Sequence, residues 1–352
     1  MNEIGSEFNI SFGNKIYTDD NIFRYLIDYN TLFLDSGRSC IKFITRQVHS
    51  GKVLLPSYIC ESVISAFKGF DIVYYNVDLN LDIDLSDIEG KLNHEVKILY
   101  IAHYFGSIQK SDTLESLNHF KNKFNFIIIE DTTHSIFSNK STIGDYNICS
   151  LRKWFPISDG GVIYSKFSFH DTSKIIANND FSKAYAMIMK TLYHDSIISN
   201  NDLIRKIFSE AEEQLDNQID IKKISWLSKY LLRFYNISEI TQRRKKNYNY
   251  LKLSLRNLGI IPVVDVDNNY CPYVFAFKIE NRDRFRDYLK DHRIYCPVHW
   301  PIHDTDLVNF KNSLNLTNKL ISIPIDQRYS LNDMEYIYKT VASYMEGFNE
   351  NC

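Results

Sequence analysis

Residues 126–164 read FIIIEDTTHSIFSNKSTIGDYNICSLRKWFPISDGGVIY. The stretch opens with residues 126–129, an aromatic and β-branched run that is typical of a buried strand. Glu130 and Asp131 follow directly, and His134 comes three residues later. Open α/β sheets bind their ligands at the carboxyl ends of the strands, so we expect these side chains to face a ligand site.

A second apolar run ends at Cys149 and Ser150, and Lys153 follows it. A carboxylate, an imidazole, a hydroxyl and an amine are thus predicted near strand ends. A Schiff-base lysine and an aspartate that partners a pyridinium nitrogen are the groups used in pyridoxal phosphate chemistry. Spacing alone leaves another interpretation open, in which Asp131 is a cap, His134 a satisfied buried histidine and Lys153 a solvated loop charge.

The same stretch resembles the core of the DegT/StrS family of sugar aminotransferases, which belong to fold type I of the pyridoxal phosphate enzymes. The family pattern places an acidic pair and a histidine or glutamine before Gly-Asp, a serine, the Schiff-base lysine and a G-(E/D)-G-G motif. The matching residues here are Glu130-Asp131 with His134, Gly144-Asp145, Ser150, Lys153 and Ser158-Asp159-Gly160-Gly161. The lysine-to-glycine spacing agrees with the family, but the serine-to-lysine spacing is two residues shorter and Ser158 replaces the first glycine.

The resemblance implies pyridoxal 5′-phosphate as cofactor and two catalytic residues, Lys153 and Asp131. Lys153 would hold the cofactor and then move a proton as general base and acid. Asp131 would keep the pyridine nitrogen protonated. His134 would reach the 3′ oxygen of the ring or pack on its edge.

A glycine turn at residues 35–39 (DSGRS) precedes a helix predicted over residues 40–48. The start of a helix can hold a phosphate, although such a turn can also be a simple cap. The turn resembles the family's S-G-(R/T)-S-A stretch, which implies that Gly37, Arg38 and Ser39 bind the cofactor phosphate and that Ser150 adds a hydroxyl. We expect N–H groups and hydroxyls, rather than a salt bridge, to meet the phosphate charge.

Two further departures from the family concern the surroundings of the cofactor. Where the family stacks an aromatic ring on the cofactor, this chain has Cys60, with Tyr58 close by as a substitute. The family's G-x-N-x-R-M motif, whose asparagine reaches the neighbouring subunit's cofactor, is absent, and residues 221–226 are nearest by order. The resemblance implies a homodimer, but the partner's contribution to the site must differ or be absent.

Predicted strands at residues 53–55, 72–75 and 96–102 alternate with helical patterns at 57–67 and 114–123. This alternation predicts a mainly parallel sheet sandwiched by helices, with right-handed crossovers. We therefore expect an α/β fold with a large cofactor-binding domain over residues 1–250, whose helical linker spans about 167–255. A smaller C-terminal α/β domain would cover residues 251–352, with strands at 273–279, 294–300 and 321–324 and helices at 282–292 and 331–345.

Composition excludes several classes of function. At 352 residues and 44% hydrophobic, the chain can bury a large core. A net charge of −2 gives no electrostatic reason to bind nucleic acid or an acidic membrane. No apolar run approaches the roughly 18 residues of a membrane span, and the N-terminus lacks a signal core. Six cysteines without metal spacing predict free thiols in a reducing cytoplasm.

Three functions remain in competition. The first is transfer of an amino group from glutamate or a similar amino acid to a keto-sugar. By resemblance this sugar would be nucleotide-linked, in surface polysaccharide or secondary-metabolite biosynthesis. The second keeps the cofactor but changes the reaction to that of a lyase, a dehydratase or a non-sugar aminotransferase. The third is a non-catalytic binding module, against which the retention of both Asp131 and Lys153 argues.

Overall fold

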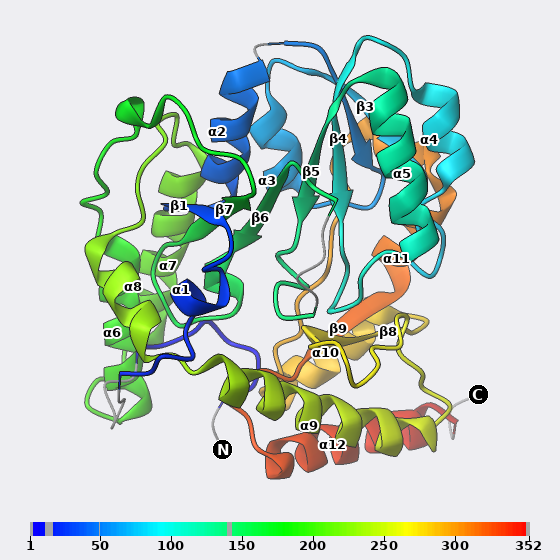
Figure 1. Ribbon diagram of the computed structural model, residues 1–352. Helices are drawn as coiled ribbons and strands as arrows, with labels where there is room; N and C mark the ends of the chain where they lie inside the picture. The colour runs from blue at the N-terminus through cyan, green and yellow to red at the C-terminus, as the bar shows by residue number, and fades with distance from the viewer. Residues whose placement is uncertain (1–2, 11–16, 49, 139–142, 350–352) are drawn as a thin grey trace.

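The computed structural model describes residues 3–10, 17–48, 50–138 and 143–349. Within these residues, a seven-stranded sheet has the order β1-β7-β6-β5-β4-β2-β3 (Figure 1). Its strands are β1 (Asn30–Leu34), β2 (Lys52–Pro56), β3 (Asp71–Tyr75), β4 (Val96–Ala102), β5 (Ile127–Asp131), β6 (Tyr146–Ser150) and β7 (Gly161–Ser165). The described helices are α1 (Ile22–Tyr25), α2 (Gly37–Val48), α3 (Glu61–Ile64), α4 (Leu85–Lys91), α5 (Ser111–Phe124), α6 (Ser182–His194), α7 (Asn201–Asp216), α8 (Trp226–Leu231), α9 (Ile237–Arg256), α10 (Arg282–Asp291), α11 (Lys311–Lys319) and α12 (Leu331–Asn349).

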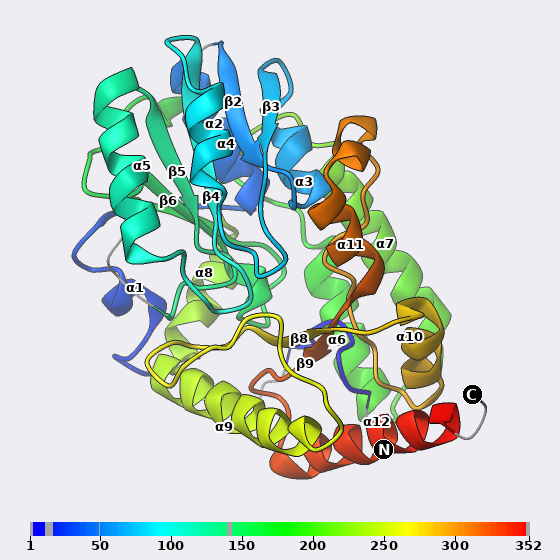
Figure 2. The same ribbon diagram turned by 90° about the vertical axis from the view of Figure 1, so that its right-hand side faces the viewer.

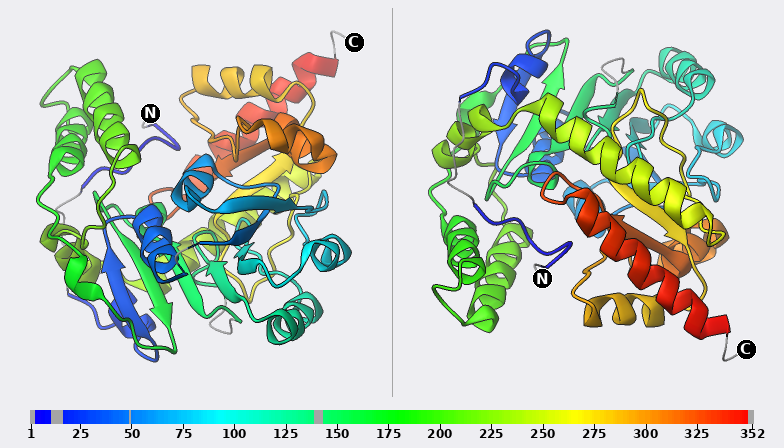
Figure 3. Two further views of the ribbon diagram at one scale, coloured as in Figure 1. Left: turned by 90° about the horizontal axis from the view of Figure 1, so that it is seen from above. Right: turned by 90° about the horizontal axis from the view of Figure 1, so that it is seen from below.

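The sheet is parallel from β3 to β6, and β7 runs antiparallel to both β6 and β1. Helix α2 lies on one side of it, and α4 and α5 lie on the other (Figure 3). Asp131 ends β5 and pairs in register with Ala102 of β4 and Ile148 of β6. The predicted fold class, a mainly parallel sheet sandwiched by helices, is confirmed.

The turn before α2 is fixed by local contacts. The Ser36 hydroxyl accepts a 3.1 Å hydrogen bond from the backbone N–H of Ser39, which is the bond of a helix N-cap. Gly161 at the start of β7 lies so close that a Cβ there would be 2.4 Å from the Ser36 carbonyl carbon. Only glycine permits this approach, so Gly161 lets β7 bring the turn next to the end of β6.

A second, antiparallel sheet consists of β8 (Val274–Lys278) and β9 (Leu320–Pro324). It packs with α9, α10 and α12 around a separate apolar cluster that includes Leu251, Phe275, Phe285, Ile323 and Ile337 (Figure 2). The strand predicted over residues 294–300 is wrong. Ile294 makes only an isolated bridge to Ile4, and Pro297 lacks the N–H that a ladder requires.

The region predicted as a helical linker contains α6, α7, α8 and most of α9. Helices α6 and α7 pack together as a hairpin at one side of the sheet (Figure 1). The helical pattern at residues 57–67 becomes the short α3 followed by a 3₁₀ turn, Ser65–Phe67. The domain boundary near residue 250 stays a proposal.

Two predictions from composition can be compared with the described residues. Cys40, Cys60, Cys149, Cys271 and Cys296 are free thiols, as predicted, whereas Cys352 lies outside the described residues. No described helix combines the length and the apolar character needed to cross a bilayer.

Candidate active site

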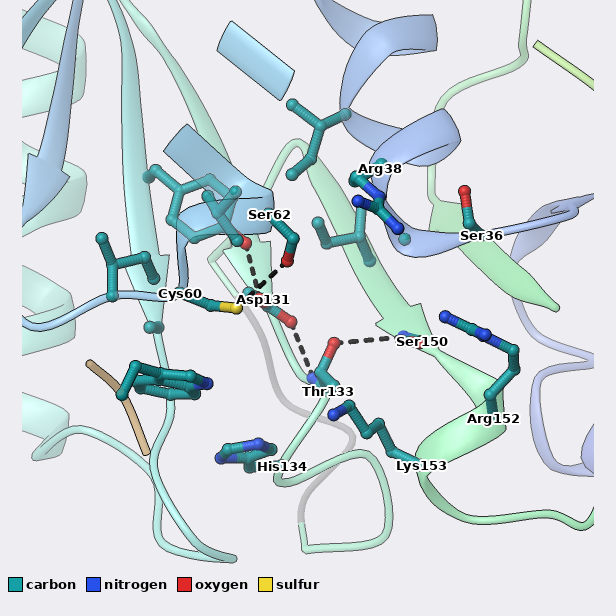
Figure 4. A pocket seen from close by; sticks show the side chains of 18 of the residues that line it. Ser36, Arg38, Cys60, Ser62, Asp131, Thr133, His134, Ser150, Arg152 and Lys153 are labelled. Atoms are coloured by element: carbon teal, nitrogen blue, oxygen red, sulfur yellow. Dashed lines mark hydrogen bonds between the residues drawn. The ribbon is translucent and has the colours of Figure 1, made fainter. Parts of the chain in front are cut away.

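A cavity of about 250 Å³ lies at the carboxyl ends of β4, β5 and β6. Its walls come from the start of α2, the segment before α3, the turn after β6, the end of α7 and Trp300. Figure 4 shows these side chains converging from different elements. Six of the seven predicted site residues line it, namely Gly37, Arg38, Asp131, His134, Ser150 and Lys153.

Ser39, the seventh, does not line the cavity. It is 2% exposed, and its hydroxyl accepts a 3.2 Å hydrogen bond from the Ser36 hydroxyl. Ser36 lines the cavity instead. Ser39 therefore stabilises the turn rather than facing a ligand.

Two donors hold the carboxylate of Asp131. The Tyr100 hydroxyl donates to Oδ2 over 2.5 Å, and the backbone N–H of Thr133 donates to Oδ1 over 2.8 Å. Burial, followed by the charge of Asp131, raises the pKa of Tyr100 far above its ordinary value, so this hydroxyl keeps its proton. Asp131 is thus oriented from the neighbouring strand and from its own loop.

Glu130, the other member of the acidic pair, has a different position. Its carboxylate is fully buried, with Oε1 2.7 Å from Nε2 of His103, and Oε2 accepts the backbone N–H groups of Ile143 and Gly144. Nδ1 of His103 accepts the N–H of Gln109, so the imidazole uses both nitrogens. Glu130 and His103 therefore anchor the loops around the cavity.

Lys153 ends a short 3₁₀ helix, η2 (Leu151–Lys153), directly after β6. The backbone N–H of Leu151 donates to the Gly160 carbonyl, and that of Trp154 donates to the Leu151 carbonyl, each over 3.0 Å. This tight turn accounts for the short serine-to-lysine spacing, because it carries Lys153 back into the cavity (Figure 4).

The amine of Lys153 faces aromatic and imidazole groups. The nearby Tyr273 raises the pKa of Lys153, and burial opposes that shift. Burial and the charge of Lys153 lower the pKa of His299 to about 3. Burial, His299 and Lys153 also lower the pKa of His134 well below its ordinary value, so both imidazoles are neutral.

His134 lies in a stack of rings. Its centroid is 4.2 Å from that of Tyr273 and 5.5 Å from that of Trp300, with interplanar angles of 14° and 17°. Its Nδ1 is buried and has no hydrogen-bond partner among the described residues. Buried polar atoms are nearly always paired, so this orphaned nitrogen indicates a ligand atom.

Ser150 contacts the helix-start turn at the cavity wall. A Cβ built on Gly37 would be 3.5 Å from the Ser150 Cβ, so β6 and the turn are in contact. The backbone N–H of Ser150 donates a 3.1 Å hydrogen bond to the Thr133 hydroxyl. The predicted phosphate-binding residues Gly37, Arg38 and Ser150 are thereby brought together.

Tyr58, named from the sequence as a substitute for the missing aromatic ring, does not line the cavity. Tyr58 is 1% exposed, and the centroid of its ring lies 5.4 Å from the ring centroid of Trp300. Trp300 lines the cavity, as Cys60 does. Trp300 was missed because it is 240 positions after Cys60 in a segment whose pattern predicted a strand.

Three charged residues of the cavity wall were also missed: Arg152, Glu212 and Asp216. Arg152 is next to Lys153 in the sequence, a position that could have drawn attention. The two acids end α7, and the amphipathic pattern of a helix does not indicate which of its exposed carboxylates meet a distant turn.

Known proteins resemble this chain in sequence and in fold. No protein-family model matches the sequence. The curated dTDP-3-amino-3,6-dideoxy-alpha-D-galactopyranose transaminase of Aneurinibacillus thermoaerophilus is 23% identical over 333 residues, 88% of this chain and 84% of that protein.

Solved structures share the architecture. Spr1654 from Streptococcus pneumoniae in its PLP form has a TM-score of 0.66 at 14% identity, covering 97% of this chain and 99% of that chain. A DegT DnrJ EryC1 StrS aminotransferase from Brucella abortus has a TM-score of 0.61 at 16% identity, covering 92% of this chain and 88% of that chain. The predicted resemblance to the DegT/StrS aminotransferases, and the fold type I architecture that it implied, are confirmed.

Proposed function

We propose that this chain is a pyridoxal-phosphate-dependent aminotransferase. It would transfer an amino group from an amino acid such as glutamate to a nucleotide-linked keto-sugar. The observation that carries the proposal is that the amine of Lys153 and the carboxylate of Asp131 reach one cavity, from the turn after β6 and the end of β5. The transaminase relative acts on a dTDP-linked amino sugar, which supports the sugar class.

The residues present fit the cofactor. Lys153 lines the cavity, and none of the described residues accepts a hydrogen bond from its Nζ, so the amine is available to an aldehyde. Asp131 is held by two donors at the cavity wall, and its carboxylate oxygens can accept a further hydrogen bond from a pyridinium N–H. The orphaned Nδ1 of His134 supplies a polar partner for a ring oxygen.

When bound, pyridoxal phosphate supplies an electron sink for the carbanion formed at the α-carbon of the amino donor. Asp131, oriented by its two donors, would hold the proton on the ring nitrogen. Nζ of Lys153 would take the proton from the α-carbon of the donor and deliver it to the C4′ carbon, and it would make the reverse transfer when the keto acceptor is aminated. His134 stays neutral, so it adds no positive charge beside that amine.

The finer assignments belong to the same proposal. We infer a cytoplasmic homodimer in surface polysaccharide or secondary-metabolite biosynthesis. Support for association comes from α8, where Trp226 is 67% and Tyr230 56% exposed, one turn apart. Exposed aromatic side chains of this size are enriched in protein interfaces.

The test is a spectroscopic one. The purified protein supplied with pyridoxal phosphate should show an absorbance band at roughly 400–430 nm, and Lys153→Ala should abolish it. Lys174→Ala, which alters an exposed lysine, is the matched control. Glutamate alone should convert the bound cofactor to its amine form, and a keto-sugar nucleotide should restore it.

Two results would contradict the proposal. A protein that takes up no cofactor would indicate a binding module. Release of ammonia or water without a second amine product would indicate a lyase or dehydratase.

A further inference from the structure

Two guanidinium groups stand at one wall of the cavity. Arg38 comes from the first turn of α2 and Arg152 from η2, and both line the cavity with Ser36, Gly37 and Ser150. Figure 4 shows both arginines on the side of Ser36 and Ser150, away from Cys60. This wall therefore carries two fixed positive charges, two hydroxyls and the N-terminal end of a helix.

Arg152 has one donor without an acceptor. Its two terminal nitrogens donate to the carboxylate of Glu212, at 2.6 Å and 3.4 Å. Its Nε is buried, and the described part of the chain offers it no hydrogen-bond partner. Buried donors of charged groups are nearly always satisfied, so an acceptor from a ligand is indicated at Nε.

Glu212 holds Arg152 in place. Its carboxylate also receives the ammonium of Lys183, so two cations meet one acid. Burial by itself would raise the pKa of Glu212, but the charges of Arg152 and Lys183 outweigh it and lower that pKa to about 2. Glu212 is therefore ionised at any physiological pH, and it fixes one edge of the guanidinium while the other edge stays available.

Arg38 is paired differently. Its partner is Asp216 at the end of α7, whose side chain is 59% exposed. Exposed ion pairs contribute little to stability, so an anion in the cavity can replace Asp216 at small cost. Arg38 can thus join Arg152 around a bound anion.

We propose that Arg152 binds the phosphate of the cofactor at the start of α2, beside Arg38, which the family resemblance already places there, and that Glu212 positions Arg152 for this contact. Guanidinium groups match phosphate oxygens through paired donors, and the helix start adds favourable N–H groups. This inference rests on the proposed function, and it replaces the expectation that the phosphate is met without a salt bridge. The cavity that holds Arg152 also holds Lys153 and Asp131, which favours the cofactor over a substrate diphosphate.

The experiment compares pyridoxal phosphate with pyridoxal, which has the same ring and aldehyde but no phosphate. Cofactor-free protein is titrated with each compound, and binding is followed by absorbance and by tryptophan fluorescence. We expect Arg152→Gln to weaken pyridoxal phosphate binding about 10-fold to 100-fold and pyridoxal binding less than about 3-fold. Arg152→Lys should recover part of the loss, because it keeps the charge.

The positioning role of Glu212 is tested by comparing the cofactor affinities of single and double variants. Glu212→Gln should weaken pyridoxal phosphate binding less than Arg152→Gln does, and the double variant should be no weaker than Arg152→Gln alone. Arg46→Gln, which alters an exposed arginine of α2, is the matched control and should leave both affinities unchanged. The melting temperature of each variant shows that the protein is folded.

Three results would overturn the proposal. If Arg152→Gln and Arg152→Lys weaken both compounds equally, Arg152 is only structural. If pyridoxal phosphate binding is unchanged but KM for a nucleotide sugar rises, Arg152 serves the substrate. If the wild-type protein binds neither compound, the proposed function itself fails, a result distinct from the other two.

Discussion

The hydroxyl of Tyr100 in β4 lies 2.5 Å from Oδ2 of Asp131 in the adjacent strand β5. Tyr100 is fully buried, and its hydroxyl keeps its proton because burial and the carboxylate raise its pKa. The carboxylate that would partner the cofactor ring is therefore oriented by the core of the sheet rather than by a surface loop.

Tyr100→Phe should weaken cofactor binding and lower the free energy of unfolding. A hydrogen bond to a charged group contributes about 1.5–3 kcal/mol. Tyr75→Phe is the control, because the Tyr75 hydroxyl donates over 2.9 Å to the uncharged carbonyl of Tyr100. Denaturant titration and cofactor titration of both variants check this. Equal loss of cofactor affinity in the two variants would show that the bond to Asp131 has no special role.

Glu130→Gln should destabilise the fold strongly. The fully buried carboxylate accepts hydrogen bonds from the backbone N–H groups of Ile143 and Gly144 and from the His103 ring. The NH₂ group of a glutamine side chain would face one of these N–H groups and could not accept its hydrogen bond. Breaking a buried charged network costs about 3–5 kcal/mol. Equilibrium unfolding in urea measures the change, with the exposed Glu115→Gln as control. A loss below about 1 kcal/mol would argue against the anchoring role.

Stability should fall as the pH decreases from about 6.5 toward 3, in part through His299. Its pKa is lowered to about 3 by burial and by Lys153, whereas an unfolded histidine titrates near 6.5. Between these pH values His299 binds a proton in the unfolded chain but stays neutral in the folded chain, so a lower pH favours unfolding. His134 contributes in the same direction.

His299→Gln should therefore reduce the loss of stability between about pH 7 and pH 5 by about 2 kcal/mol. His170→Gln, which alters an exposed histidine, should leave the pH dependence unchanged. Unfolding free energies measured at several pH values decide the matter. An identical pH dependence in wild type and His299→Gln would mean that the pKa of His299 is the same in the folded and the unfolded protein.

Trp300→Ala should weaken cofactor binding about 10-fold, because its indole is an aromatic ring in the cavity wall that can pack against the cofactor ring. Trp300→Phe should retain most of the affinity, and Trp226→Phe, at an exposed position, should retain all of it. Fluorescence quenching during cofactor titration gives the cofactor affinity of each variant. Unchanged binding in Trp300→Ala would show that the indole contacts only protein.

Local pattern was sufficient for the predicted strands of the seven-stranded sheet and for the order of the motifs. The apolar run before Glu130 predicted a buried strand, so Asp131 was expected at a strand end. The run over residues 294–300 was misjudged because a short apolar segment with a proline can equally be an irregular segment, here one that starts in the core at Ile294 and reaches the cavity wall at Trp300.

The sequence by itself determined the sheet, the carboxylate at the end of β5 and the lysine after β6, because hydrophobic periodicity and chain order are local properties. Only the tertiary structure decided that Ser39 faces away, that Trp300 rather than Tyr58 lines the cavity, and that Glu212 meets Arg152. Those contacts join residues far apart in the chain, and they depend on how helices and loops pack, which no local pattern encodes.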